Sequence, residues 1–214
     1  SKNLNIYINK EVQRIKNVNL LVDISSIINQ KNKIKKIIIN SEKNEIIDLL
    51  KFIRSYKINI PTLYLENIIR KGEITYKITA STKDQKNYNI ELNGKISAVN
   101  INILDKEIIE NVNFNLDYKD QLLQIKNLKF KYKKTNFSSE NITGLIDKNL
   151  IKVKGDFKNK VNNNLIYAFF DRDLKNYLND NVNLSSKSSF EIDFTKKFKV
   201  KNYKLETDID IKNM

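Results

Sequence analysis

The sequence contains no Cys, His or Trp, and it has only four Gly residues and one Pro. Without Cys and His the chain has no disulfide framework, thiol nucleophile or histidine base, and typical zinc sites are excluded. The scarcity of Gly also excludes the Gly-rich loops that hold phosphate groups. These absences remove most familiar catalytic and cofactor sites, so we expect a protein that is not an enzyme and has no metal or cofactor.

Paired carboxylates are the remaining candidates for catalysis. They occur as Asp171 with Asp173 and as Asp208 with Asp210. On a strand, Asp208 and Asp210 share the polar face opposite Ile209, where nothing apolar raises the pKa of a general acid. We therefore interpret these residues as solvated or capping groups and expect no catalytic site.

Long hydrophobic segments are also missing, since no apolar run approaches the roughly 20 residues that cross a bilayer. The chain does not begin with Met, and its last alternating run ends at Ile211, three residues before the end. We expect the whole of 1–214 to be a fragment of a longer protein.

Charge is abundant and one-sided, with 39 Lys and Arg against 25 Asp and Glu and a net charge of +14. Nucleic-acid sites usually favour Arg forks, whereas the basic residues here are almost all Lys. Residues such as Lys129, Lys131 and Lys133 alternate with apolar ones, which is typical of a solvated sheet face. The sequence therefore predicts no nucleic-acid binding, with weak attraction to anionic lipid headgroups as an alternative.

Alternation of apolar and polar residues dominates the chain and predicts strands with one apolar face. Strands are expected in an N-terminal set over 1–40 and in a central β-meander over 57–160. Turns are expected at 84–87, at Asn93-Gly94 and at Lys119-Asp120. The predicted fold is mainly β: a long antiparallel meander that forms a strongly curved, groove-like sheet with one or two short amphipathic helices.

A helix is predicted over 41–56, with Ser41 as its N-cap. Its apolar residues follow helical spacing and are expected to pack on an end of the sheet. They are Ile46, Leu49, Leu50 and Ile53. Covering a sheet end limits aggregation, and a helical gate for lipid is the alternative role. Pro61 and the alternation of Ile58 and Ile60 predict a return to strands.

A helical break is predicted over 161–180, followed by a further set of strands over 186–214. The alternation changes phase near Asn202, which predicts a bulge there.

About a dozen amphipathic strands need a partner for their apolar side. Two sheets can close on each other as a sandwich, or one curved sheet can leave an apolar groove that holds acyl chains. For the groove we expect these lining residues: Ile74, Tyr76, Ile78, Tyr88, Ile90, Leu92, Val99, Ile101, Ile103, Val112, Phe114 and Leu116.

Several segments resemble the AsmA-like proteins, and the YhdP and TamB branch in particular. They are Gly94–Leu104, Val112–Leu116, Leu123–Phe130 and the amphipathic helix that leads into Ile60-Pro61. The resemblance covers about residues 43–155. It implies a repeating β-groove, an anchor in the inner membrane through a helix outside this sequence, and a periplasmic location.

The role that this resemblance implies is to hold or conduct phospholipid between the inner and outer membranes of a Gram-negative envelope. Its expected partners are phospholipid acyl chains and the membrane, while protein partners in the envelope are left open. The alternative is a structural or adhesive all-β module with a closed sandwich core and no lipid.

Overall fold

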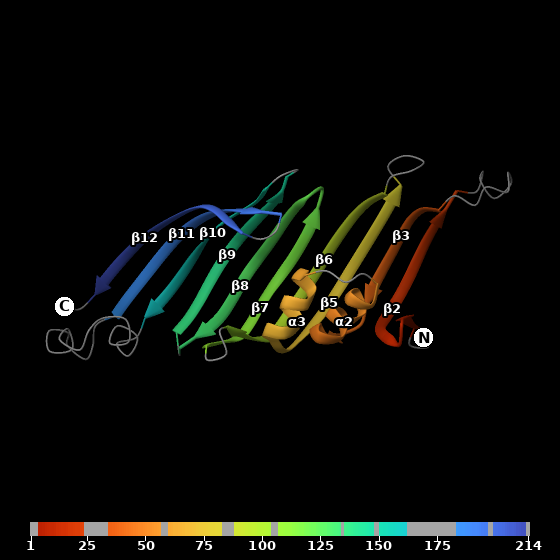
Figure 1. Cartoon of the computed structure of the whole chain (residues 1–214), viewed down its shortest axis with the longest axis horizontal. Helices are drawn as coiled ribbons and strands as arrows, with labels where there is room; N and C mark the ends of the chain where they lie inside the picture. The colour runs from red at the N-terminus through yellow and green to blue at the C-terminus, as the bar shows by residue number, and fades with distance from the viewer. Residues whose placement is uncertain are drawn as a thin grey trace.

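A computed structural model describes residues 4–23, 34–56, 60–82, 88–103, 107–133, 135–147, 150–161, 183–196 and 199–212. Over these residues the chain forms one open antiparallel sheet of 12 strands, with two short helices on one face (Figure 1).

The helices are α2 (Ile46–Tyr56) and α3 (Ile60–Ile68). The strands are β1 (Leu4–Ile8), β2 (Glu11–Val22), β3 (Ile34–Ser41), β4 (Asn44–Glu45), β5 (Ile69–Thr82), β6 (Tyr88–Ile103), β7 (Glu107–Lys119), β8 (Leu122–Tyr132), β9 (Thr135–Ile146), β10 (Leu150–Val161), β11 (Asn183–Thr195) and β12 (Val200–Lys212).

The strands follow one another in sequence order across the sheet. The short β4 is the exception, because it pairs with β5 beside the main path. β1 and β12 are the two edges, and the described strands form no second layer. The predicted antiparallel meander is therefore confirmed, and a closed sandwich is not the arrangement of this part of the chain.

Bulges interrupt neighbouring strands at one level of the sheet. The pairing register shifts on both sides of β7, and Ala98, Asn111 and Asn127 have φ values of 53°, 52° and 56°. Each bulge moves the apolar residues of its strand from one parity to the other, because it adds a residue without ending the strand.

The predicted turn at Asn93-Gly94 is wrong for this reason. Both residues lie inside β6, where Asn93 pairs with Lys77 and with Asp117 of the neighbouring strands. The phase change that suggested two strands is the bulge at Ala98. The turn at Lys119-Asp120 is present, with Asp120 and Gln121 at positive φ. The turn predicted at 84–87 lies outside the described residues.

The helical region differs from the prediction in two places, at the start of the first helix and in the segment that follows it. Ser41 is the last residue of β3, and its Oγ accepts a hydrogen bond from the backbone N–H of Tyr76 (2.7 Å). The helix begins only at Ile46 and ends at Tyr56, as predicted. The expected strand near Ile60 is instead α3, with Pro61 in its first turn, where a missing N–H costs nothing.

The helical break predicted over 161–180 lies outside the described residues, apart from Val161 at the end of β10. The following strands continue the same sheet, because β11 pairs with β10 along its length. The bulge predicted near Asn202 is present: Asp193 pairs with Asn202 and Phe194 with Val200, so that Lys201 is the extra residue.

Candidate functional site: the apolar face of the sheet

The sheet has two chemically distinct faces, which the pairing register defines. Ile74, Ile96 and Phe114 lie opposite one another on three adjacent strands and therefore share a face. We call the side that carries these residues the apolar face. The alternate positions, such as Lys95 and Asn115, lie on the other side, which we call the lysine face.

The register places all twelve predicted lining residues on the apolar face. They differ in exposure along it. Buried residues lie near the bulges and are Ile74, Tyr76, Val99 and Val112. Partly buried residues are Ile78, Leu92, Ile101, Phe114 and Leu116. Exposed residues lie toward the strand ends and are Tyr88 (59%), Ile90 (53%) and Ile103 (37%).

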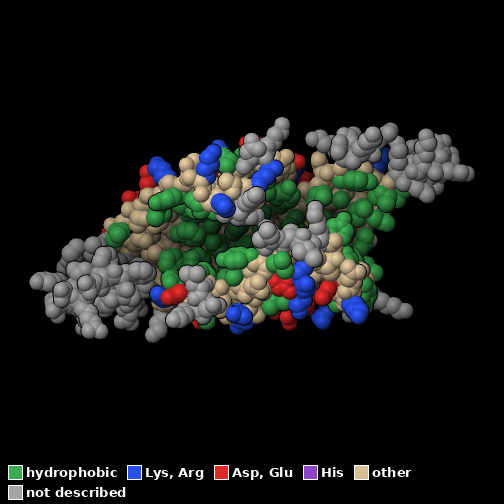
Figure 2. All heavy atoms as spheres, in the orientation of Figure 1, with side chains coloured by type: hydrophobic (Ala, Val, Ile, Leu, Met, Phe, Trp, Pro, Cys, Tyr) green, Lys and Arg blue, Asp and Glu red, His purple; other side chains and the backbone are tan. Residues whose placement is uncertain are grey.

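Figure 2 views this face and shows hydrophobic side chains gathered over the middle of the sheet. The face is hollowed there, and the helices rise along one side of the hollow. α2 packs on β2 and β5, and α3 packs on β5 and β6, so the helices leave β8 to β12 uncovered. The apolar face is therefore only partly closed within the part of the chain that the structure describes.

Two glycines allow close contacts between paired strands beside the bulges. A Cβ on Gly72, whose φ is +149°, would lie 2.6 Å from Cγ2 of Val99. A Cβ on Gly155 would lie 2.8 Å from Cγ1 of Ile142. The side chains of Val99 and Ile142 thus rest on glycine backbone, which contributes to their burial without a second sheet.

A row of aromatic rings crosses the uncovered part of the apolar face, and sequence reasoning missed it. Phe130 stacks on Phe137 with ring centroids 5.0 Å apart and meets Phe157 edge-on at 5.9 Å. Phe157 in turn stacks on Phe190 at 5.2 Å. The alternation of apolar and polar residues indicates only that each Phe lies on an apolar strand face. The register between strands is what brings the rings of four strands into one row.

The predicted helix residues divide between core and surface. Ile46 and Leu50 are buried in the core cluster, and Leu49 packs against it, whereas Ile53 is 39% exposed. The Arg54 guanidinium binds the Glu66 carboxylate through two hydrogen bonds of 2.9 and 3.2 Å, joining α2 to α3. No described helix combines the length and apolar character that a membrane crossing requires.

A polar cluster anchors the helix-covered end of the apolar face. Asn44 accepts a hydrogen bond from the Arg14 N–H (2.9 Å) and donates to the carbonyls of Arg14 and Glu42. The Tyr76 hydroxyl donates to Oε1 of the fully buried Gln13 (3.4 Å). Burial raises the pKa of Tyr76. These contacts satisfy polar groups that the core encloses.

The bulges are held by asparagines on the lysine face. Oδ1 of Asn113 accepts the backbone N–H of Ala98 (3.0 Å), and Oδ1 of Asn100 accepts that of Asn111 (3.1 Å). Backbone donors that the bulges leave without a strand partner are thus paired. Asparagine-rich strands are suited to such bulges because the short amide reaches nearby backbone.

Ion pairs between adjacent strands cover the middle of the lysine face. Hydrogen bonds from Lys126, which has the larger effect, and from Asn93 hold the pKa of Asp117 below its ordinary value. A hydrogen bond from Lys119 lowers the pKa of Glu91 in the same way. The distances are 2.8 Å for Lys126 with Asp117 and 2.7 Å for Lys119 with Glu91. These groups are structural ion pairs that join neighbouring strands.

Reactive groups do not converge anywhere on the described sheet. Within it, no group of three or more acidic side chains is placed to hold a metal ion. The apolar face is a broad surface of aliphatic and aromatic side chains, and its main chemical property is that it is hydrophobic.

Comparisons with known proteins give no relative. No family model, curated protein or solved structure matches the chain. The resemblance to AsmA-like proteins therefore stays a prediction.

Proposed function

We propose that this chain is a non-enzymatic lipid-holding segment whose apolar face binds the acyl chains of phospholipid. The observation that supports it is an amphipathic sheet of 12 strands with two helices over one end of its apolar face and no second layer among the described residues. Soluble proteins rarely leave large contiguous apolar surfaces without an apolar partner.

The energetics favour an acyl chain as that partner. Exposing hydrocarbon to water costs about 0.8 kcal/mol per CH₂, so a long tail loses on the order of 12 kcal/mol on leaving a membrane. A surface of interchangeable Ile, Leu, Phe and Tyr side chains recovers much of this without a specific residue. The proposal includes the AsmA-like role, in which such a segment lies in the periplasm and conducts phospholipid between two membranes.

Native mass spectrometry of the purified protein tests the proposal. We expect phospholipid to co-purify and to be lost when a charge enters the apolar face, as in Ile101→Asp and Phe114→Asp. Both side chains are partly buried beside the core, so these variants require circular dichroism to show that the sheet is retained.

A matched control is Asn115→Asp, which adds the same charge to β7 beside Phe114 but on the lysine face. We expect this variant to keep its lipid. If the native protein carries no phospholipid, or if all three variants lose it equally, the proposal fails.

The structural or adhesive module remains a second candidate. Its closed core is not the arrangement of the described strands, so it would have to cover the apolar face in another way. A native state that binds neither phospholipid nor a hydrophobic dye would favour it.

A further inference from the structure

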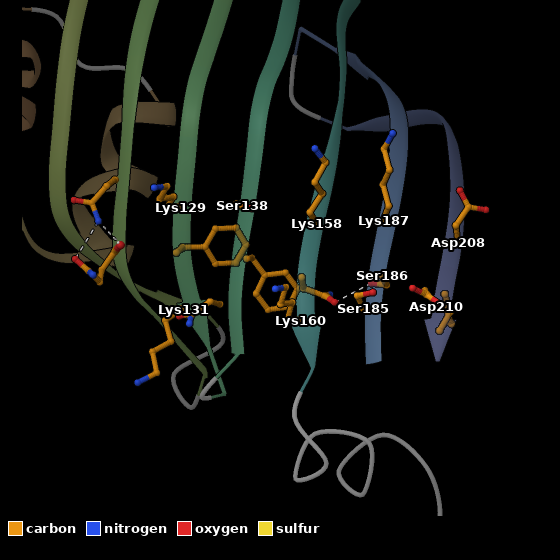
Figure 3. Close-up of a pocket in the computed structure, with 17 residues that line it drawn as sticks. Lys129, Lys131, Ser138, Lys158, Lys160, Ser185, Ser186, Lys187, Asp208 and Asp210 are labelled. Atoms are coloured by element: carbon orange, nitrogen blue, oxygen red, sulfur yellow. Dashed lines mark hydrogen bonds between the residues drawn. The ribbon is translucent and has the colours of Figure 1, made fainter. Parts of the chain in front are cut away.

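A channel crosses the lysine face at the C-terminal end of the sheet, opposite the aromatic row. It has a volume of about 910 Å³ and runs across β7 to β12. Five lysines line it: Lys129, Lys131, Lys158, Lys160 and Lys187. Two aspartates, Asp208 and Asp210, lie on β12 at one end of it (Figure 3).

The register arranges the lysines in two rows. The first row contains Lys129, Lys158 and Lys187, with Ser138 of β9 between Lys129 and Lys158. The second row contains Lys131 and Lys160. Adjacent strands lie about 4.8 Å apart, so the first row extends over about 14 Å from β8 to β11. A ligand on this surface would meet several ammonium groups at once.

Carboxylates balance only part of this charge: Asp208 and Asp210 belong to the lining, and Asp208 lies opposite Lys187 in the strand register. Lys158 binds the Glu140 carboxylate at 2.5 Å. In the described part of the chain, Lys129, Lys131, Lys160 and Lys187 form no ion pair. Other lysines close by in the sequence behave differently, because Lys119, Lys126 and Lys133 each bind a carboxylate of an adjacent strand.

We propose that this channel docks on the headgroups of anionic phospholipids at a membrane surface. Lysine ammonium groups bind phosphate as point charges, and clusters of lysines are attracted to anionic leaflets. The channel has no arginine fork and no phosphate-binding glycine loop in its lining, so its attraction is multivalent and not specific for one phosphate. Acyl chains on the apolar face are not needed for this contact.

The chemistry of the lining does not favour single-stranded nucleic acid. Such ligands need aromatic side chains on which bases stack. The two phenylalanines in the lining, Phe130 and Phe137, belong by register to the apolar face, where their rings stack on each other.

Co-sedimentation with vesicles tests the proposal. We expect the protein to bind vesicles of equal parts phosphatidylcholine and phosphatidylglycerol, and not vesicles of phosphatidylcholine alone. Neutralising the four unpaired channel lysines should weaken binding at least about 100-fold, since each contributes several-fold near an anionic surface. This variant carries Lys129→Gln, Lys131→Gln, Lys160→Gln and Lys187→Gln.

A control variant has the same net charge but removes scattered lysines of β2, β5, β6 and β12. It carries Lys16→Gln, Lys71→Gln, Lys95→Gln and Lys201→Gln, all of which are exposed. We expect it to lose less than about 10-fold, because these four lysines lie outside the channel lining and are spread over four strands.

Each of several results would overturn the proposal. They are equal losses in both variants, no binding to the anionic vesicles, and binding of a homopolymeric single-stranded DNA through the same lysines without binding to vesicles. Displacement by inorganic phosphate more than by chloride at equal ionic strength would also contradict it, because it would indicate a site for one small anion. The channel variant should still carry co-purified phospholipid, so failure here is distinct from failure of the lipid-holding function.

Discussion

The two ends of the sheet are built from the same alternating pattern but are stabilised differently. At the N-terminal end, helices cover the apolar face, and Ile15 and Ile74 are 1% and 6% exposed. At the C-terminal end, the aromatic row leads to an edge strand on which Tyr203 and Leu205 are 79% and 64% exposed. Alternation therefore indicates which face is apolar, but it does not indicate whether that face is covered.

A charge placed at each end should give the largest contrast. Ile15→Asp buries an unpaired carboxylate in the core, and we expect it to lower the free energy of unfolding by more than about 4 kcal/mol, or to prevent folding. Leu205→Asp stays in water and should change it by less than about 0.5 kcal/mol. Urea denaturation followed by circular dichroism measures both, and similar losses would refute the contrast.

Removing a ring tests whether the aromatic row replaces helices as the stabilising layer. Phe157 contacts rings on both sides, at 5.9 and 5.2 Å. We expect Phe157→Ala to cost about 2–3 kcal/mol, because the side chain is only partly buried. Phe157→Leu should recover about half of the loss. If Phe157→Ala leaves the urea midpoint unchanged, the row contributes no stability.

The close-approach glycines give a smaller effect, which should again differ between the ends. Gly72→Ala adds a Cβ against Val99 and also requires a φ of +149°, so we expect a loss of about 1–3 kcal/mol. Gly155→Ala meets only Ile142 and should cost less. Gly94→Ala, with its nearest contacts at 3.7 Å, serves as the control and should be nearly neutral in thermal unfolding.

The smallest predicted effect is on the pH dependence of stability. Lys126 and Asn93 lower the pKa of Asp117, and Lys158 lowers the pKa of Glu140. A carboxyl whose pKa is lowered by folding stabilises above its unfolded pKa of about 4, and this contribution is lost as the pH falls through the folded pKa.

Asp117→Asn should therefore flatten the loss of stability below about pH 4. Glu140→Gln should change it less, because its side chain is 79% exposed compared with 33% for Asp117. Thermal unfolding at a series of pH values between neutral and acid compares the two variants. An equal change in both would mean that exposure does not set the strength of these ion pairs.

Much of the fold could be predicted because each strand carries its own signal. The alternation at Ile74 or Phe114 is local, so it identified both the strand and its apolar face. The bulge at Asn111 was not predicted, because a bulge is defined by the pairing between two strands. In the sequence alone, the change in alternation that it causes is the same as the change caused by a short turn. α3 was missed because Ile60, Thr62 and Tyr64 also alternate, and contacts with α2 decide in favour of a helix.

The sequence by itself determined an antiparallel sheet with one apolar and one lysine-rich face, because side-chain direction in a strand has a period of two. Only the tertiary structure decided that the sheet stays open, that bulges align across neighbouring strands, and that Phe130, Phe137, Phe157 and Phe190 form one row. It also decided which lysine side chains form an ion pair with a carboxylate and which do not. Register between distant segments sets all of these, and no local pattern encodes it.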